Sequence, residues 1–209
     1  TFNGLFPTKP LRIEPTHEEV AREAVYVIEF GEGDDTAFGQ GTAFFLEGVG
    51  LVTAHHVLDG IGPAWAKIFR PHKRTQVYRA RFGPVVCSRR DLAVLEHDVP
   101  AVEQVHLNLG AVPARGRQAI MALGFPAFHD ADELGVRPGH IVGRTTRSGV
   151  RLIEVDSVLT GGLSGGPIVN ERYEVLGVVH RGGGDESKQL AIDVAEISSL
   201  LTEQGAAGV

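Results

Sequence analysis

The chain has 209 residues, of which 43% are hydrophobic, and its formal net charge at pH 7 is −6. This size is enough for one sizeable domain or for two small, closely packed ones. The negative charge argues against binding nucleic acid through a broad basic surface, and no apolar run approaches the roughly 20 residues of a membrane helix. A single cysteine, Cys87, excludes an intramolecular disulfide and favours a reducing compartment.

Residues 1–23 are predicted to form an N-terminal extension with a short helix. Three prolines within residues 1–15 indicate an extended segment, and the stretch THEEVAREA (16–24) then predicts the helix. Thr16 and Glu19 have the spacing of a capping box, in which each side chain binds a free backbone N–H at the helix start. The chain opens with Thr1 and no secretory signal, so we expect it to be a piece of a longer protein.

Short apolar runs follow, each four to eight residues long, rich in β-branched side chains and separated by glycine, proline or charge. Such runs are typical of strands, and the 27 glycines also favour a protein rich in strands and turns. The runs cover residues 25–30, 41–48, 50–54, 64–69, 75–82, 92–97, 119–125, 139–145, 150–155, 167–170, 173–180 and 189–194. These two sets of six predict an all-β protein of two tandem antiparallel six-stranded β-barrels.

The first barrel is expected over residues 24–105 and the second over 117–193, joined by a connector at 106–116. A C-terminal helix and tail are expected over 194–209. Asp193 is the expected N-cap of that helix. Its apolar residues fall on one helical face, and they are Val194, Ile197, Leu200 and Leu201.

The stretch TGGLSGGPIV (160–169) places Ser164 between two pairs of glycines. This pattern fits the nucleophile of an α/β-hydrolase, the nucleophile of a trypsin-like protease, or a plain turn. An α/β-hydrolase needs a helix directly after the serine, with its acid and histidine later in the chain. Pro167 and the β-branched residues behind it are a poor helix opening, and too few residues follow to carry the other two groups.

Two upstream stretches supply the groups that would activate a serine. VTAHHVLDG (52–60) has two adjacent histidines after an apolar strand, and SRRDLAVLEH (88–97) has Asp91 before another. A serine hydroxyl is a weak nucleophile without a base, imidazole suits that task near neutral pH, and a buried carboxylate orients the ring. The chain order histidine, aspartate, serine is one of three used by serine hydrolases.

Four motifs together resemble the trypsin-like (chymotrypsin-fold) serine proteases, especially the disulfide-free bacterial branch with the HtrA/Deg and glutamyl endopeptidase types. They are GTAFFLEGVGLVTAHHVL, DLAVLE, ALGFP and GGLSGGPIVNERYEVLGVV, within roughly residues 24–200. The resemblance implies a serine endopeptidase that works through an acyl-enzyme, with His56 as base, Asp91 as orienting acid and Ser164 as nucleophile. It implies an oxyanion hole from the backbone N–H groups of Gly162 and Ser164, and it leaves His55 as a spectator.

The resemblance also implies a substrate site. The substrate backbone would pair beside VVHRGG (178–183), and SVLTGG (157–162) would form the wall of the P1 pocket. The residues expected to bind substrate are Val158, Leu159, Thr160, Val179, His180, Arg181 and Gly182. Val158 stands where enzymes that cut after lysine or arginine carry an aspartate, which favours an uncharged, aliphatic P1 side chain. The alternative is an acidic P1 side chain attracted by His180 and Arg181, as a histidine on this strand does in glutamyl endopeptidases.

Leu163 departs from the family pattern, in which asparagine or aspartate precedes the serine. A leucine cannot pair with a newly freed N-terminus, so activation by N-terminal cleavage is not expected. It could also disturb the oxyanion turn, which keeps open a rival interpretation. In that interpretation the chain is a catalytically inactive peptide-binding or scaffold module on the same fold.

The expected partner is a polypeptide substrate, together with regulatory domains that are fused to this segment or bind it from outside. No metal, cofactor, nucleic acid or membrane is expected to take part. The bacterial cytoplasm is the favoured location, and an exported or periplasmic location stays open because the true N-terminus is not visible.

Overall fold

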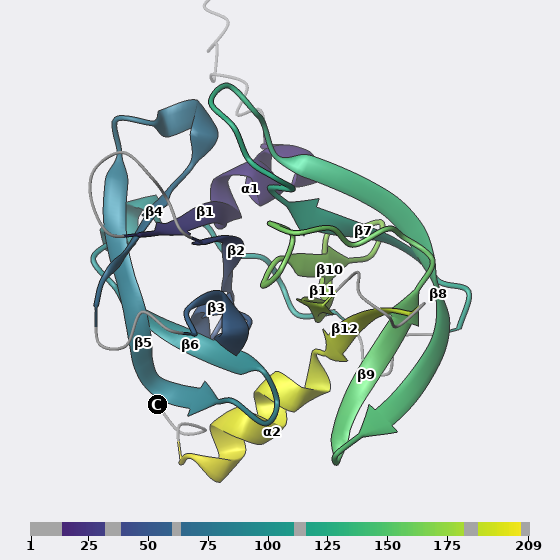
Figure 1. Cartoon of the computed structure of the whole chain (residues 1–209). Coiled ribbons are helices and arrows are strands. Elements are labelled where there is room, and N and C mark those ends of the chain that lie inside the picture. Colours follow the sequence, from purple (N-terminus) through teal and green to yellow (C-terminus); the bar gives the residue numbers. More distant parts are fainter. Residues whose placement is uncertain (1–13, 32–38, 60–63, 111–115, 182–187, 206–209) are drawn as a thin grey trace, which may run out of the picture.

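Two closed antiparallel barrels of six strands each make up most of the molecule, which confirms the predicted fold class. The computed structural model describes residues 14–31, 39–59, 64–110, 116–181 and 188–205. Figure 1 shows the barrels side by side, with the blue and teal strands of the first on the left and the green strands of the second on the right.

The first barrel has the strand order β1-β2-β3-β6-β5-β4. Its strands are β1 (Val25–Phe30), β2 (Gly39–Leu46), β3 (Gly50–Thr53), β4 (Ala66–Phe69), β5 (Val77–Cys87) and β6 (Leu92–His97). Within the β3–β6 pair, Thr53 lies opposite Ala93. Because His56 follows Thr53 closely and Asp91 comes just before Ala93, both residues leave the sheet at the same edge.

The second barrel has the strand order β10-β11-β12-β9-β8-β7. Its strands are β7 (Ala119–Gly124), β8 (Gly135–Arg147), β9 (Val150–Val155), β10 (Pro167–Val169), β11 (Val175–Arg181) and β12 (Gln189–Asp193). Pro167 of β10 lies opposite Val178 of β11. This register brings the residues before β10, including Ser164, next to the end of β11, where His180 lies.

Strands β5 and β8 are longer than the sequence predicted. β5 continues through Gly83 and Pro84 to Cys87, with a register shift against β6 between Phe82 and Val86. β8 likewise continues through a proline and three glycines. Glycine and proline normally end a strand, but at a bulge they let a barrel strand bend without ending.

Two helices complete the described part of the chain. α1 (His17–Ala24) begins with the predicted capping box, in which the backbone N–H of Thr16 donates to Glu19 and that of Glu19 donates to the Thr16 hydroxyl. α2 (Ala195–Glu203) begins one residue later than predicted. Its N-cap is Val194 and not Asp193, and Val194 makes no side-chain cap hydrogen bond. Asp193 still accepts a hydrogen bond from the N–H of Ala195. Neither helix is long and apolar enough to cross a membrane.

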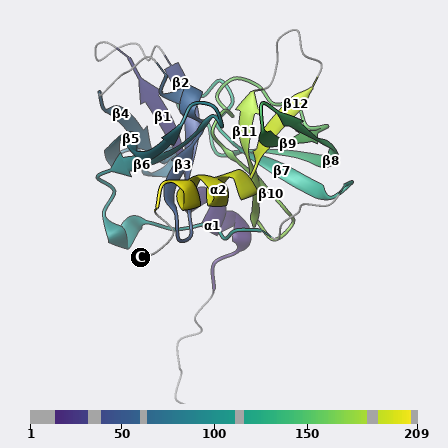
Figure 2. The same ribbon diagram turned by 90° about the horizontal axis from the view of Figure 1, so that it is seen from below.

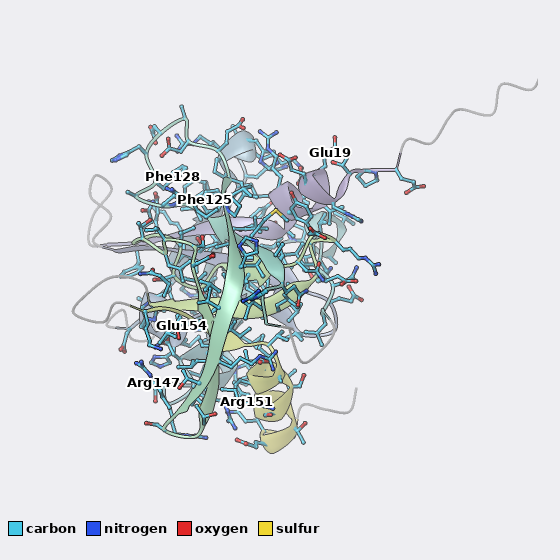
Figure 3. The ribbon with its side chains drawn as sticks, turned by 90° about the vertical axis from the view of Figure 1, so that its right-hand side faces the viewer. Glu19, Phe125, Phe128, Arg147, Arg151 and Glu154 are labelled. Carbon is cyan, nitrogen blue, oxygen red and sulfur yellow. The ribbon has the colours of Figure 1, made fainter. Side chains whose placement is uncertain are left out.

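The two barrels pack against each other through apolar side chains. One core cluster includes Phe44 and Val52 of the first barrel and Leu123 and Val178 of the second. Phe125 and Phe128, which Figure 3 shows close together, form an edge-to-face pair with ring centroids 5.8 Å apart. Helix α2 lies across the junction of the barrels, as Figure 2 shows from below. The two barrels therefore share one continuous apolar core cluster.

Candidate active site

His56 is bound to Asp91 through both its backbone and its side chain. It lies in a short 3-10 helix, His55–Val57, directly after β3. The backbone N–H of His56 donates to Asp91 Oδ1 at 2.8 Å, and the ring Nδ1 lies 2.7 Å from Asp91 Oδ2. Two contacts to one carboxylate fix both the loop and the ring, so Nε2 of the ring is the nitrogen left for a reaction.

The neighbouring His55 has different contacts. Its ring stacks on Phe82 of β5, with centroids 4.9 Å apart and an angle of 18° between the planes. Only its backbone reaches the acid, since its N–H donates to the Asp91 carbonyl at 3.0 Å. Of the two adjacent histidines, His56 is therefore the one whose ring meets the carboxylate.

Asp91 lies in a tight turn before β6, with a left-handed backbone angle φ of 55° and only 8% of its surface exposed. Burial raises the pKa of its carboxyl, but hydrogen bonds from His180 and His56 lower it by more. The pKa of Asp91 therefore lies well below its usual value, and the group is a carboxylate at neutral pH.

A second imidazole, that of His180 on β11, also contacts Asp91. Its Nδ1 lies 2.5 Å from Asp91 Oδ2, the same oxygen that His56 contacts. The two rings are 6.1 Å apart and inclined at 78°. His180 was predicted to bind substrate, and its contact with Asp91 was not predicted. One feature of the sequence pointed to this contact: His180 lies on the strand that was expected to run beside the Ser164 turn.

The three side chains could in principle hold a metal ion, because one ligand atom from each lies within 4.8 Å of the others. A tetrahedral zinc ion with bonds of 2.0–2.1 Å would separate neighbouring ligand atoms by about 3.3 Å. The observed nitrogen–oxygen distances of 2.7 and 2.5 Å are those of hydrogen bonds. The arrangement of His56, Asp91 and His180 therefore fits hydrogen bonds better than a bound metal ion.

Ser164 lies in a turn that packs against the first barrel. Its carbonyl accepts a hydrogen bond from the N–H of Thr42 at 2.9 Å, and the N–H of Gly165 donates to the Val179 carbonyl at 2.9 Å. Gly165 has φ +83°, and a Cβ there would lie 2.2 Å from the hydroxyl oxygen of Thr53. Only glycine fits, and its absent side chain lets the serine turn lie beside the residues that lead into His56.

The turn before Ser164 leaves two backbone donors open. Gly162 has φ +89°, and its carbonyl accepts a hydrogen bond from the Thr42 hydroxyl at 2.7 Å. In the part of the chain that the structure describes, neither the N–H of Gly162 nor that of Ser164 donates to a protein acceptor. Such a pair of free N–H groups can stabilise a negative oxygen in a transition state.

Leu163 is accommodated in the core and does not open the turn. Its side chain is fully buried in the second barrel. Its N–H donates to the Thr160 carbonyl at 3.2 Å, and its own carbonyl accepts from the N–H of Gly166 at 2.9 Å. Leu163 thus packs in the apolar core, where an aspartate could have formed an ion pair. The N–H groups of Gly162 and Ser164 on either side of it make no hydrogen bond to the described part of the chain.

The Ser164 hydroxyl makes no hydrogen bond to His56 among the described residues. Catalytic hydrogen bonds are often long or poorly aligned before substrate binds and tighten in the complex. The described geometry thus brings His56, Asp91 and His180 together and places the Ser164 turn beside them.

The residues predicted to bind substrate differ in exposure. Val158 exposes 63% of its surface, whereas Leu159 exposes 2% and belongs to the core of the second barrel. The N–H of Leu159 donates to the side chain of Gln189 at 2.8 Å, which fixes this segment to β12. Thr160 is exposed and Val179 is buried. The side chain of Arg181 and all of Gly182 lie outside the described residues, so the P1 preference stays a prediction.

These features are those of a trypsin-like peptidase, and the comparisons with known proteins agree. The family described as "Trypsin-like peptidase domain" matches residues 41–178, more than half of the chain, so the chain belongs to this family. No curated protein matches the sequence.

Several solved structures share the fold. The inactive form of the Rv3671c protease is 20% identical, with a TM-score of 0.69 over 90% of this chain and 92% of that one. A serine-to-alanine mutant of Rv3671c from M. tuberculosis H37Rv, also an inactive form, has the same identity and TM-score over 98% and 97%. The serine endoprotease from Yersinia pestis is 18% identical, with a TM-score of 0.69 over 94% and 69%. At these identities the likeness shows the fold alone.

Proposed function

We propose that the chain is a serine endopeptidase in which Ser164 is the nucleophile, His56 the general base and Asp91 the orienting acid. The observation that supports this most is the double contact of His56 with Asp91. The backbone nitrogen of His56 lies 2.8 Å from Asp91 Oδ1, and the ring Nδ1 lies 2.7 Å from Asp91 Oδ2. A catalytic histidine needs a buried carboxylate on its Nδ1, because the carboxylate fixes the tautomer and stabilises the imidazolium. The ring of His180 contacts the same carboxylate, but only His56 is also held there by its backbone N–H.

The chemistry follows from these roles. The Ser164 oxygen attacks the carbonyl carbon of the scissile peptide bond while its proton moves to Nε2 of His56. The carbonyl oxygen becomes negative and is stabilised by the N–H groups of Gly162 and Ser164. His56 then gives its proton to the departing amine, and the C–N bond breaks to leave an acyl-enzyme. A water molecule attacks the ester and loses a proton to His56. The bond to the Ser164 oxygen then breaks, His56 returns the proton to that oxygen, and the second product leaves.

The substrate is a polypeptide, which we propose pairs with β11 as an additional strand. For the P1 side chain we propose an uncharged, aliphatic group, because Val158 supplies no carboxylate to pair with a buried cation. Profiling a peptide library by mass spectrometry tests this. Dominant cleavage after glutamate, or after arginine, would contradict it.

A fluorophosphonate probe tests the proposed function directly, since it reacts only with an activated serine. We expect labelling of Ser164 in the native protein and none in Ser164→Ala or His56→Ala. Both variants should keep the melting temperature of the parent within a few degrees, which separates lost chemistry from lost folding. A folded native protein that the probe does not label would favour the inactive peptide-binding module.

A further inference from the structure

We propose that His180 is a positioning residue, which acts on the reaction through Asp91 and not by contact with the substrate. This inference rests on the proposed function, because it assigns His180 a part in that same site. The central observation is the 2.5 Å contact between His180 Nδ1 and Asp91 Oδ2.

The hydrogen bonds around Asp91 define the protonation of both rings. An ionised carboxylate only accepts hydrogen bonds, and Asp91 is ionised because its pKa is lowered by His180 and His56 despite burial. Each histidine therefore carries a proton on Nδ1 and donates it to the carboxylate. With the His56 backbone N–H on the other oxygen, the carboxylate receives three donors.

Three donors restrict the carboxylate more than the two from His56 alone. Asp91 belongs to a turn with a left-handed backbone, a conformation that costs free energy for a residue other than glycine. A donor from the opposite barrel keeps the carboxylate from rotating away from His56. Since reaction rates depend steeply on the alignment of reacting groups, this restraint has a direct effect on turnover.

Strand β11 links this restraint to the serine. The carbonyl of Val179 accepts the N–H of Gly165, next to Ser164, and the N–H of Val179 donates to Gly166 at 2.8 Å. The very next residue on the strand is His180. One strand of the second barrel thus fixes both the serine turn and, across the junction, the acid of the first barrel. Figure 1 places β11 in the middle of the molecule, consistent with this double role.

A matched pair of variants tests the proposal. His180→Asn keeps a side-chain N–H donor at nearly the position of Nδ1, whereas His180→Leu keeps similar bulk without a donor. For a labelled peptide substrate, we expect His180→Leu to lower kcat about 10–100-fold with KM changed less than about threefold. His180→Asn should retain kcat within about fivefold of the native protein. Equal losses in the two variants would refute a role for the donor.

A double-mutant cycle identifies the route of the effect. If His180 acts through Asp91, then adding His180→Leu to Asp91→Asn should lower kcat by less than about twofold further. A full additional loss in that background would show that His180 acts on something else. A large rise in KM for His180→Leu with kcat unchanged would contradict the proposal and would support the alternative that His180 binds substrate.

The outcomes also separate this proposal from the proposed function. If the native protein reacts with the fluorophosphonate probe and His180→Leu keeps native kcat, only the role of His180 is refuted. If the native protein does not react at all, both proposals fail. Should His180→Leu fail to fold, as judged by near-UV circular dichroism, His180→Ala takes its place and the prediction for His180→Asn is unchanged.

Discussion

The two barrels hold their parts of the site in contrasting ways. In the first barrel, side chains do the positioning, since the Asp91 carboxylate accepts hydrogen bonds from the backbone and ring of His56. In the second barrel, the Ser164 turn is positioned by backbone hydrogen bonds and by glycines that leave no room for a side chain. The first arrangement depends on charge and protonation, whereas the second depends on shape.

This contrast has a practical consequence for mutation. A change of functional group at Asp91 should remove activity and leave the fold, because the replacement can keep the same volume. A change of size at Gly165 in the serine turn should damage both, because an added Cβ there meets the hydroxyl of Thr53 and the backbone of Thr42 in the other barrel. Activity and stability measured together therefore distinguish the two arrangements.

The largest effect on activity is expected from Asp91→Asn. An asparagine presents an N–H toward His56 in place of an acceptor, which favours the wrong tautomer of the ring. We expect kcat to fall by about 10⁴-fold, as in this triad generally, while the melting temperature changes by only a few degrees. Hydrolysis of a labelled peptide and a thermal melt measure both. A loss below tenfold would show that Asp91 does not orient the base.

Gly165→Ala should reduce both quantities. The new Cβ would lie 2.2 Å from the Thr53 hydroxyl oxygen, and the residue has φ +83°. Left-handed backbone and overpacking together should lower the free energy of unfolding by about 2–4 kcal/mol. Activity should fall about 100-fold as the serine turn moves. The control is Gly48→Ala, which also has positive φ but open space around it. Equal effects of the two changes would contradict the steric explanation.

Arg90→Met tests how the turn of Asp91 is supported. Arg90 exposes 6% of its side chain and pairs with the buried Glu196 of α2 at 2.9 Å. Glu196 keeps its contact with Arg151 at 2.6 Å but loses the hydrogen bond from the buried guanidinium of Arg90, so the free energy of unfolding should fall by about 1–3 kcal/mol. Activity should fall less than tenfold, because Arg90 touches neither His56 nor Ser164. Arg89→Met, at a neighbouring exposed residue, is the control and should be near neutral in chemical denaturation.

The smallest effect is expected from His55→Ala. Its ring stacks on Phe82 and makes no contact with the carboxylate of Asp91 among the described residues. We expect a loss of about 1 kcal/mol in stability from the missing ring contact and kcat within about threefold of the native value. If His55→Ala removes activity and His56→Ala does not, the assignment of the base is wrong.

Much of the fold could be predicted because its signals are local. Each strand has its own short apolar run, and the helix from His17 has its cap residues beside it in the sequence. The errors also have local causes. Pro84 and Pro138 interrupt the apolar pattern of β5 and β8, yet a bent barrel strand continues through both.

The site was predictable only in part. His56, Asp91 and Ser164 stand in recognisable motifs, and chain order suggested their roles. The contact of His180 with Asp91 joins residues 89 positions apart, and that of Arg90 with Glu196 joins residues 106 apart. Such contacts depend on how one barrel docks against the other, which a single sequence does not encode in any short pattern.

The position of α2 has a consequence for biosynthesis. Arg90, next to Asp91, forms its ion pairs with Glu196 and Glu203, which lie on the last helix of the described chain. Figure 3 shows Arg151 of the second barrel beside the same helix, and it also pairs with Glu196. A ribosome makes the chain from the N-terminus onward, so the loop of Asp91 receives these ion pairs only after α2 has emerged. The support of the Asp91 loop by α2 is therefore completed late, only once that helix has left the ribosome.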